Sequence, residues 1–443
     1  MKLEPLAASA IVPLVKRHAG DAAFYWAQRD GSIDSPHLDL ARLRHVDRLL
    51  QAHLDGLVVA GDEGWQQALQ ALKRWQGPGE AFTCAVLGLT HGDGSRLQTL
   101  WPLIAHQPER LARGLVSALA WVATSPGRVY TPWIEHWLSH AEQPLLKAIA
   151  LRAATCVGMQ QAEAAQAAQA ACTATELELR VAGCKALALC TPTSTTQQVL
   201  RGALQDPALR VRGAAACSLL QVEGAQRAVL ASLLATIHEC AQTLLEARGR
   251  EKPPIERRLR NWLRVLAVHL PLGHPAVPDL LDRLPERHAL EFIAWHGDAT
   301  YAPLLLEIAS QTDMAQGALW AFNSLTDQGK NLNQPRPSDV DEAALAKPGC
   351  FAGLPYPDLE LWRRWWSERG PQLPTGKRLL YGKVLDDDAQ LNQQHCLSLL
   401  IEGDQRARHQ AAVLSAQYCK TPPINIRERA HKQITRLGIT LYD

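Results

Sequence analysis

The chain has 443 residues, 20% of them charged, and a formal net charge of +2. Since a single hydrophobic core stops growing at roughly 250–300 residues, we expect either several domains or an elongated fold that adds core as it lengthens. The nearly neutral net charge favours neither a nucleic-acid coat protein nor a protein with a strongly acidic partner.

The cysteines and the N-terminal stretch bear on the compartment. The ten cysteines stand singly, mostly beside Ala or Leu, and no C-x-x-C pair occurs, which is typical of reduced, buried thiols. The first residues, MKLEPLAASAIVPLVKRHAG, contain Pro5 and Pro13 and no convincing cleavage site. A run of about 18 apolar residues is also missing. We therefore expect a cytoplasmic protein without a membrane span.

The first part of the chain predicts two amphipathic helices. One contains VPLVKRHAGDAAFYWAQRD, and the other carries an apolar stripe from Leu40 to Leu57 and ends near Gly61 and Gly64. The repeats that follow in the sequence predict a solenoid, an array of stacked helix pairs. Because such an array needs an atypical cap to shield its first repeat, we interpret residues 1–64 as a helical cap.

Residues 65–326 contain an Ala-rich sequence pattern that recurs at a spacing of about 30 to 36 residues. TELELRVAGCKALAL (175–189) superposes on QDPALRVRGAAACSL (205–219) with Arg180 over Arg210, and QPLLKAIALRAAT (143–155) has Lys147 in the arginine's place. Asp206 and Pro207 suit a helix start. The small residues let the next helix pair approach closely, so the pattern predicts an all-α fold, namely a curved, right-handed HEAT-like α-solenoid of helix pairs.

The last quarter departs from the simple repeat. Residues 327–376 are rich in Pro, Gly and Trp, and we interpret them as an insertion that packs against the array, with Trp362, Trp365 and Trp366 at helical spacing. The Ala-rich repeat pattern returns in DQRARHQAAVLSAQ (404–417), so we interpret residues 377–443 as C-terminal HEAT-like repeats. Five further tryptophans fall on apolar helix positions and are predicted core residues: Trp26, Trp121, Trp262, Trp295 and Trp320.

The candidate metal site is EHWLSH, where His136 and His140 lie one helical turn apart. Two such imidazoles can ligate zinc, but a third ligand is needed and none is indicated. With Trp137 between them, the same helix can instead present a partner-binding surface, and ordinary packing is the third interpretation.

Basic and aromatic residues supply the other candidate contacts. Lys147, Arg152, Arg180, Lys185, Arg210 and Arg212 come from equivalent parts of successive helices and could align as a ladder that meets phosphates or an acidic protein. Pairing with acidic residues of the array, such as Asp206 and Glu176, is the alternative. Further candidates are Arg257 and Arg258, in the charged segment 246–264, and the neighbouring Trp365 and Trp366.

Enzyme motifs are missing from the sequence. It has no G-x-x-x-x-G-K-[ST], no G-x-S-x-G and no H-E-x-x-H, and GLTHGDGSR (88–96) lies between two predicted helices without a preceding strand. We therefore expect no enzyme, no catalytic or metal-ligating residue, no cofactor and no small-molecule substrate.

The pattern D-P-x-x-[LV]-R-x-x-A-A-x-A-L resembles the HEAT-like repeat that is also found in phycobilisome lyases. Together with HAGDAAFYWAQRD near the start and LPYPDLELWRRWWSERGPQLPTGKRLLYG near the end, the chain is similar to a bacterial family of HEAT-repeat proteins associated with type VI secretion clusters. The resemblance covers nearly the whole chain. It implies a role in binding a partner near secreted effectors, and it carries no catalytic residues.

Three hypotheses follow. The first is an immunity protein that binds a cognate secreted toxin and occludes its active site. The second is an adaptor or chaperone that carries an effector to the secretion machinery, and the third is a modifying enzyme of the phycobilisome-lyase type. In the first two, the partner is a secreted protein, with no membrane and no nucleic acid involved.

Overall fold

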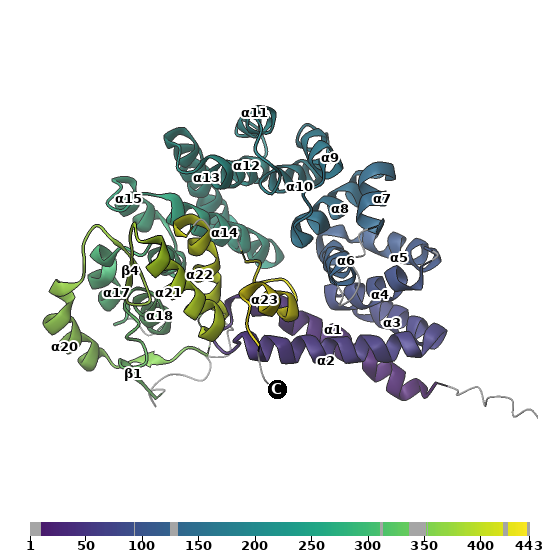
Figure 1. The fold of residues 1–443 in the computed structure, drawn as a ribbon, viewed down its shortest axis with the longest axis horizontal. Coiled ribbons are helices and arrows are strands. Elements are labelled where there is room, and N and C mark those ends of the chain that lie inside the picture. Colours follow the sequence, from purple (N-terminus) through teal and green to yellow (C-terminus); the bar gives the residue numbers. More distant parts are fainter. Residues whose placement is uncertain are drawn as a thin grey trace, which may run out of the picture. The chain divides into compact units, whose positions relative to one another are not determined.

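The computed structural model describes residues 10–92, 94–124, 132–310, 313–335, 351, 353–419 and 424–440. These residues are mostly helical, with four short strands, so the predicted all-α class is confirmed. The chain divides into two compact units, shown in sequence colours in Figure 1. The first unit comprises Met1–Thr196, Ile401–Arg406 and Ile424–Asp443, and the second comprises Gln197–Leu400 and Ala407–Pro423.

The first unit holds the N-terminal helices and one C-terminal helix. They are α1 (Val12–Gly31), α2 (Leu40–Val59), α3 (Gly61–Trp75), α4 (Pro78–His91), α5 (Ser95–His106), α6 (Pro108–Ala123), α7 (Pro132–His140), α8 (Pro144–Val157), α9 (Ala162–Cys172), α10 (Leu177–Leu187) and α23 (Ala430–Leu437). Helix α11 (Ser194–Ala203) contains the boundary to the second unit.

The second unit holds the remaining elements. They are α12 (Leu209–Glu223), α13 (Arg227–Glu246), α14 (Lys252–His269), α15 (Ala276–Arg283), α16 (Glu286–His296), α17 (Ala302–Ile308), α18 (Ala315–Thr326), β1 (Asn333–Gln334), β2 (Tyr356–Pro357), α20 (Leu359–Arg369), β3 (Arg378–Leu380), β4 (Lys383–Leu385), most of α21 (Ala389–Glu402) and most of α22 (Gln405–Tyr418). Strands β1 and β2 pair antiparallel, as do β3 and β4.

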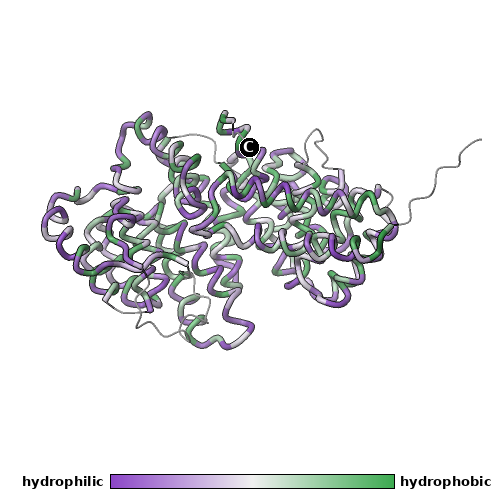
Figure 2. Tube along the Cα trace, turned by 90° about the horizontal axis from the view of Figure 1, so that it is seen from below, coloured by the Kyte–Doolittle hydropathy of each residue, from purple (hydrophilic) through white to green (hydrophobic). Residues whose placement is uncertain are grey.

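Within each unit, a helix packs on the helix two places further along the chain. In the first unit α4 packs on α6, α6 on α8 and α8 on α10; in the second, α12 packs on α14, α14 on α16 and α16 on α18. Figure 2 shows hydrophilic and hydrophobic residues interspersed along the helical trace, as amphipathic helices require. Proline stands in the first turn of α4, α6 and α8, where its missing N–H is no loss.

The predicted close approach of neighbouring helices is confirmed at Gly114. A Cβ atom on this residue of α6 would lie 2.3 Å from the carbonyl oxygen of Pro78 and 2.7 Å from the amide nitrogen of Phe82, both in α4. Gly183 of α10 approaches α9 in the same way, with the Ala168 carbonyl oxygen 2.7 Å from the would-be Cβ. The small residues therefore let one helix rest on the backbone of another.

The five tryptophans predicted for the core are all buried, with exposed fractions between 3% and 8%. The nine described cysteines form no disulfide with one another and seven of them are buried, in agreement with the sequence, while Cys350 lies outside the described residues. Burial raises the pKa of Cys240 to about 11 and that of Cys396 to about 12, so both thiols stay protonated near neutral pH.

Among the described residues, α13 is the one helix long and apolar enough to cross a membrane. Its buried residues, from Val229 to Leu244, recur three to four positions apart on one face. It packs against α12 and α14. A one-sided apolar stripe covered by neighbouring helices is typical of an amphipathic helix.

The predicted insertion contains a true helix. Asp358 caps α20 by accepting hydrogen bonds from the amides of Glu360 and Leu361, at 3.1 and 3.0 Å. Trp362 is fully buried, and its ring centroid lies 4.7 Å from that of Phe322 in α18. The segment therefore packs on α18 within the second unit. Residues 336–350 and 352 of the insertion lie outside the described residues.

Arg378 joins two helix ends within the second unit. Its buried guanidinium donates hydrogen bonds to the carbonyl oxygens of Ala267, Val268 and Leu270, at the end of α14, and of Trp295 and His296, at the end of α16, over 2.7 to 3.3 Å. Its Nε donates to the hydroxyl of Tyr418 at 2.8 Å. The last carbonyls of a helix have no partner within the helix and carry partial negative charge, so this one cation satisfies two C-termini.

Asp47 anchors the C-terminal segment in the first unit. One carboxylate oxygen, on α2, lies 2.5 Å from Nε of Arg29 in α1, and the other accepts a hydrogen bond from the amide of Ala430 at 2.7 Å. Arg429 adds a contact over the ring of Trp121, 3.9 Å from its centroid. The carboxylate thus lies at the N-terminus of α23, where negative charge is favourable.

The glycine contact in the first unit can be tested by substitution. We expect Gly114→Ala to lower the free energy of unfolding by about 1–3 kcal/mol, because the added methyl group forces α6 away from α4. Gly20→Ala is the matched control: nothing lies within 4 Å of a Cβ atom there, and alanine raises the helix propensity of α1. Urea denaturation measures both, and equal stabilities of the two variants would contradict the close approach.

Two buried histidines predict an acid-sensitive second unit. Burial lowers the pKa of His288 to about 3 and that of His296 to about 4 from a usual value of 6.5. Because the folded pKa is depressed, the stability due to the neutral rings is complete above pH 6.5 and is lost as the pH falls toward 4. By pH 5 the loss is about 2 kcal/mol for each histidine.

The measurement is the free energy of unfolding of the wild type and of His288→Leu between pH 7.5 and pH 5. The variant should lose only the part of the slope that comes from His288, about 2 kcal/mol between pH 7.5 and pH 5. Parallel curves for the two proteins would show that His288 is not buried in the neutral form.

Candidate partner-binding surface

Helix α7 presents two histidines to solvent. The imidazoles of His136 and His140 are exposed and stacked, with ring centroids 5.0 Å apart, and a ring nitrogen of His140 lies 3.3 Å from the carbonyl oxygen of His136. Trp137, which we predicted to contact a partner, is only 8% exposed and packs inward. In the described part of the chain, no three His, Cys, Asp or Glu side chains are grouped so that they could hold a metal ion.

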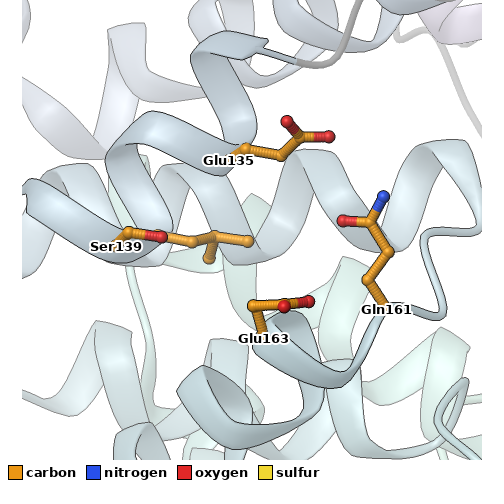
Figure 3. A pocket seen from close by; sticks show the side chains of 5 residues that line it. Glu135, Ser139, Gln161 and Glu163 are labelled. Carbon is orange, nitrogen blue, oxygen red and sulfur yellow. The ribbon is translucent and has the colours of Figure 1, made fainter.

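An open pocket of about 520 Å³ lies between α7 and α9. Glu135, Leu138 and Ser139 line it from α7, and Gln161 and Glu163 line it from the start of α9. Figure 3 shows the side chains of Glu135, Gln161 and Glu163 extending into the same space. Two carboxylates and an amide oxygen can accept hydrogen bonds from a cationic or amide group, so the pocket is suited to a polar side chain.

Two arginines of the predicted ladder bind backbone carbonyl oxygens just before the starts of their own helices. Arg180 donates to the carbonyl oxygens of Ala174 and Thr175 at 3.1 and 2.6 Å. Arg212 donates to the equivalent oxygens of Asp206 and Pro207, both at 3.1 Å, and also pairs with Glu239. Arg180 therefore corresponds to Arg212 and not to Arg210, so the sequence alignment was two residues out of register.

The start of α12 also differs from the sequence prediction. The helix begins at Leu209, with Ala208 as its N-cap residue, and the Asp206 carboxylate accepts a hydrogen bond from the amide of Ala208 at 2.8 Å. Asp206 thus shapes the turn before the helix, and its carbonyl oxygen accepts a hydrogen bond from Arg212 at 3.1 Å.

Three basic residues act electrostatically on one residue near the end of α8. The positive charges of Arg152, Lys185 and Arg427 all act on the thiol of Cys156. Cys156 is exposed as a residue, but neighbouring atoms desolvate its thiol and raise its pKa, and the three cations act in the opposite direction. Arg152 and Lys185 belong to the predicted ladder. Lys147, one helix turn before Arg152, is half-buried.

Arg427 is the residue of this group that sequence reasoning missed. It lies in the C-terminal segment, which is fixed on α8 by a hydrogen bond from the Asn425 side chain to the Cys156 carbonyl oxygen, at 3.1 Å. Arg29 donates to the carbonyl oxygen of Arg427, also at 3.1 Å. No local pattern in the sequence indicates a contact between residues 269 positions apart.

The remaining candidates lie in the second unit. Arg257 is exposed, whereas Arg210, Arg258, Trp365 and Trp366 are half-buried. The rings of Trp365 and Trp366 surround Phe322 of α18, with centroids 5.4 and 6.4 Å away. Their neighbours show that both tryptophans contribute to the packing of α20, and each keeps part of its surface exposed.

The comparisons with known proteins give no family. No protein-family model matches the chain. None of the curated proteins matches it either. A crystal structure of an engineered protein is similar at 14% sequence identity over 93% of this chain and 95% of the other, and its TM-score of 0.25 is too low to indicate a shared arrangement.

The ladder arginines can be assigned a role by mutation. We expect Arg180→Met and Arg212→Met each to lower the free energy of unfolding by about 0.5–1.5 kcal/mol, because in each case one half-buried and one exposed carbonyl oxygen lose a charged donor. The matched control, Lys185→Met, removes an exposed cation of α10 and should change stability by less than about 0.5 kcal/mol. Urea denaturation measures the free energy of unfolding of each variant. If both arginine variants are as stable as the wild type, the two side chains do not stabilise the fold and stay candidates for a partner contact.

Proposed function

We propose that the chain is a HEAT-like α-solenoid that binds another protein, and that it acts in the cytoplasm as an immunity protein that occludes a secreted type VI toxin. The repeated packing of each helix on the one two places further along supports the solenoid, since each helix pair then buries its apolar face against the next. The small residues at Gly114 and Gly183 support the same arrangement.

The observation that carries the binding function is the surface of the first unit. Exposed histidines on α7, an open polar pocket between α7 and α9, and the half-buried Arg152 of α8 all lie on helices that pack on one another. A surface built on packed helices is preformed, so binding costs little conformational entropy.

The type of partner rests on the sequence. The resemblance to HEAT-repeat proteins associated with type VI secretion clusters supports a secreted effector, and occlusion by a large surface is the mechanism that such a scaffold can supply. The adaptor hypothesis shares the binding surface and differs only in the consequence of binding. The experiment therefore has to measure both the complex and the activity of the partner.

We expect affinity purification of the chain from its native cell extract to yield one stoichiometric protein partner. An immunity protein predicts that this partner is toxic when expressed alone and harmless when the chain is co-expressed. It also predicts that the purified chain abolishes the activity of the purified toxin at a one-to-one ratio.

Binding without inhibition would overturn the immunity role in favour of an adaptor. The absence of any stable protein partner would overturn the binding function as a whole. Turnover of a small molecule by the purified chain would favour the lyase-type enzyme.

A further inference from the structure

Helix α3 ends on a tryptophan that the core does not cover. Trp75 is 60% exposed, and among the described residues it is the one tryptophan with more than half of its surface in solvent. The guanidinium of Arg74 lies over its ring, 4.8 Å from the centroid. Tryptophan and arginine are enriched among the residues that dominate the binding energy of protein interfaces. An exposed pair of the two is therefore a candidate contact for a partner protein.

The start of α6 holds the end of α3 at this point. Nη2 of Arg110 donates a hydrogen bond to the Trp75 carbonyl oxygen at 3.3 Å, and Nε2 of Gln107 donates one to Oε1 of Gln76 at 3.1 Å. We call these residues, with Arg74, the Trp75 patch. Because both hydrogen bonds join α3 to a second helix of the first unit, the patch is assembled before a partner arrives.

Gln76 has a backbone conformation that is costly for a residue with a side chain. Its φ of 50° and ψ of 36° lie in the left-handed region, where glycine is the usual residue at the end of a helix. Its amide donates to the Leu72 carbonyl oxygen at 2.8 Å, which closes the last turn of α3. Such a conformation persists where the surrounding contacts hold it, and it is commoner at functional sites than elsewhere. The turn after Trp75 is thus consistent with a binding site.

The charges of the patch determine what it attracts. Arg74 and Arg110 are exposed, as is Lys73 beside them, and in the described part of the chain no ion pair joins either arginine to a carboxylate. The carboxylates nearest to them in the sequence, Glu80 and Glu109, stand in the first turns of α4 and α6, where the helix N-terminus attracts negative charge. Two guanidinium groups beside an exposed ring are complementary to carboxylates beside an apolar side chain.

We infer that the Trp75 patch binds a segment of the partner protein in which carboxylates flank an apolar side chain. This rests on the proposed function, which it deepens by naming the chemistry of the partner. Arg74 and Arg110 each take a carboxylate through paired N–H donors. The exposed part of the Trp75 ring covers the apolar side chain.

A polypeptide fits the patch better than a single-stranded nucleic acid. Proteins that bind single strands stack successive bases on several aromatic side chains along a positively charged groove. Here one exposed tryptophan is accompanied by two exposed arginines, and the guanidinium of Arg74 already lies over its ring. The patch therefore matches one apolar side chain and its flanking charges.

The experiment uses the full chain, two fluorescein-labelled peptides and three variants. Four Glu-Leu repeats and four Glu-Ser repeats give peptides of equal length and charge that differ in the apolar side chain. Trp75→Ser removes the ring, and Arg74→Ala with Arg110→Ala removes the two cations. The matched control, Arg227→Ala with Arg250→Ala, removes two exposed arginines of the second unit.

Binding is measured by fluorescence anisotropy in about 20 mM salt, where screening is weak. Far-ultraviolet circular dichroism and urea denaturation check that all four proteins fold. We expect the wild type to bind the Glu-Leu peptide with a dissociation constant below about 1 mM and about fivefold tighter than the Glu-Ser peptide, because the ring covers leucine surface that serine lacks.

Trp75→Ser should remove the preference for the Glu-Leu peptide. The variant without Arg74 and Arg110 should bind both peptides at least about tenfold more weakly, and the control should change by less than about threefold. Equal weakening in the two double variants would mean that net charge alone governs binding, and would overturn the inference. So would the absence of wild-type binding, or a Glu-Leu preference that survives Trp75→Ser. Tighter binding of an eight-nucleotide thymidine strand, lost in Trp75→Ser, would overturn it in favour of a nucleic acid.

The failure of this inference can be separated from the failure of the proposed function. If a protein partner co-purifies equally with wild type and with Trp75→Ser, the partner is held elsewhere and only the Trp75 patch is excluded. If no protein co-purifies but the Glu-Leu peptide binds as expected, the patch recognises acidic segments with apolar residues while the proposed function falls.

Discussion

The first unit depends on the buried carboxylate of Asp47. It neutralises Arg29 of α1 and accepts a hydrogen bond from the first amide of α23, so three elements distant in the sequence meet at one charged group. A buried ion pair gains little over an apolar contact, but removing one partner leaves a charge without compensation. Asp47 therefore selects one arrangement for the C-terminal segment. That arrangement also fixes the backbone of Arg427, whose carbonyl oxygen accepts a hydrogen bond from Arg29.

In the second unit a buried cation joins several elements, as the Asp47 carboxylate does in the first unit. Arg378 has no carboxylate among its hydrogen-bond partners in the described residues; instead, five carbonyl oxygens at the ends of α14 and α16 and the Tyr418 hydroxyl surround its guanidinium. Burial lowers the pKa of Arg378, but the partial negative charge of two helix ends offsets the loss of water. The short strand β3 that carries Arg378 is thereby fixed beside these helices, which also explains why an irregular segment interrupts the helical pattern at this point.

Much of the fold could be predicted because its causes are local. Apolar spacing, first-turn prolines and small residues at intervals indicate helices that pack closely, and Gly114 and Gly183 lie where that argument requires them. The register between repeats could not be predicted, because Arg180 and Arg212 bind backbone carbonyl oxygens. Every residue has such an oxygen, so the residue types do not indicate which ones are bound. Of the candidate site, the sequence indicated His136, His140, Arg152 and Lys185. It could not indicate Arg427, whose position follows from Asp47 and Asn425 across most of the chain.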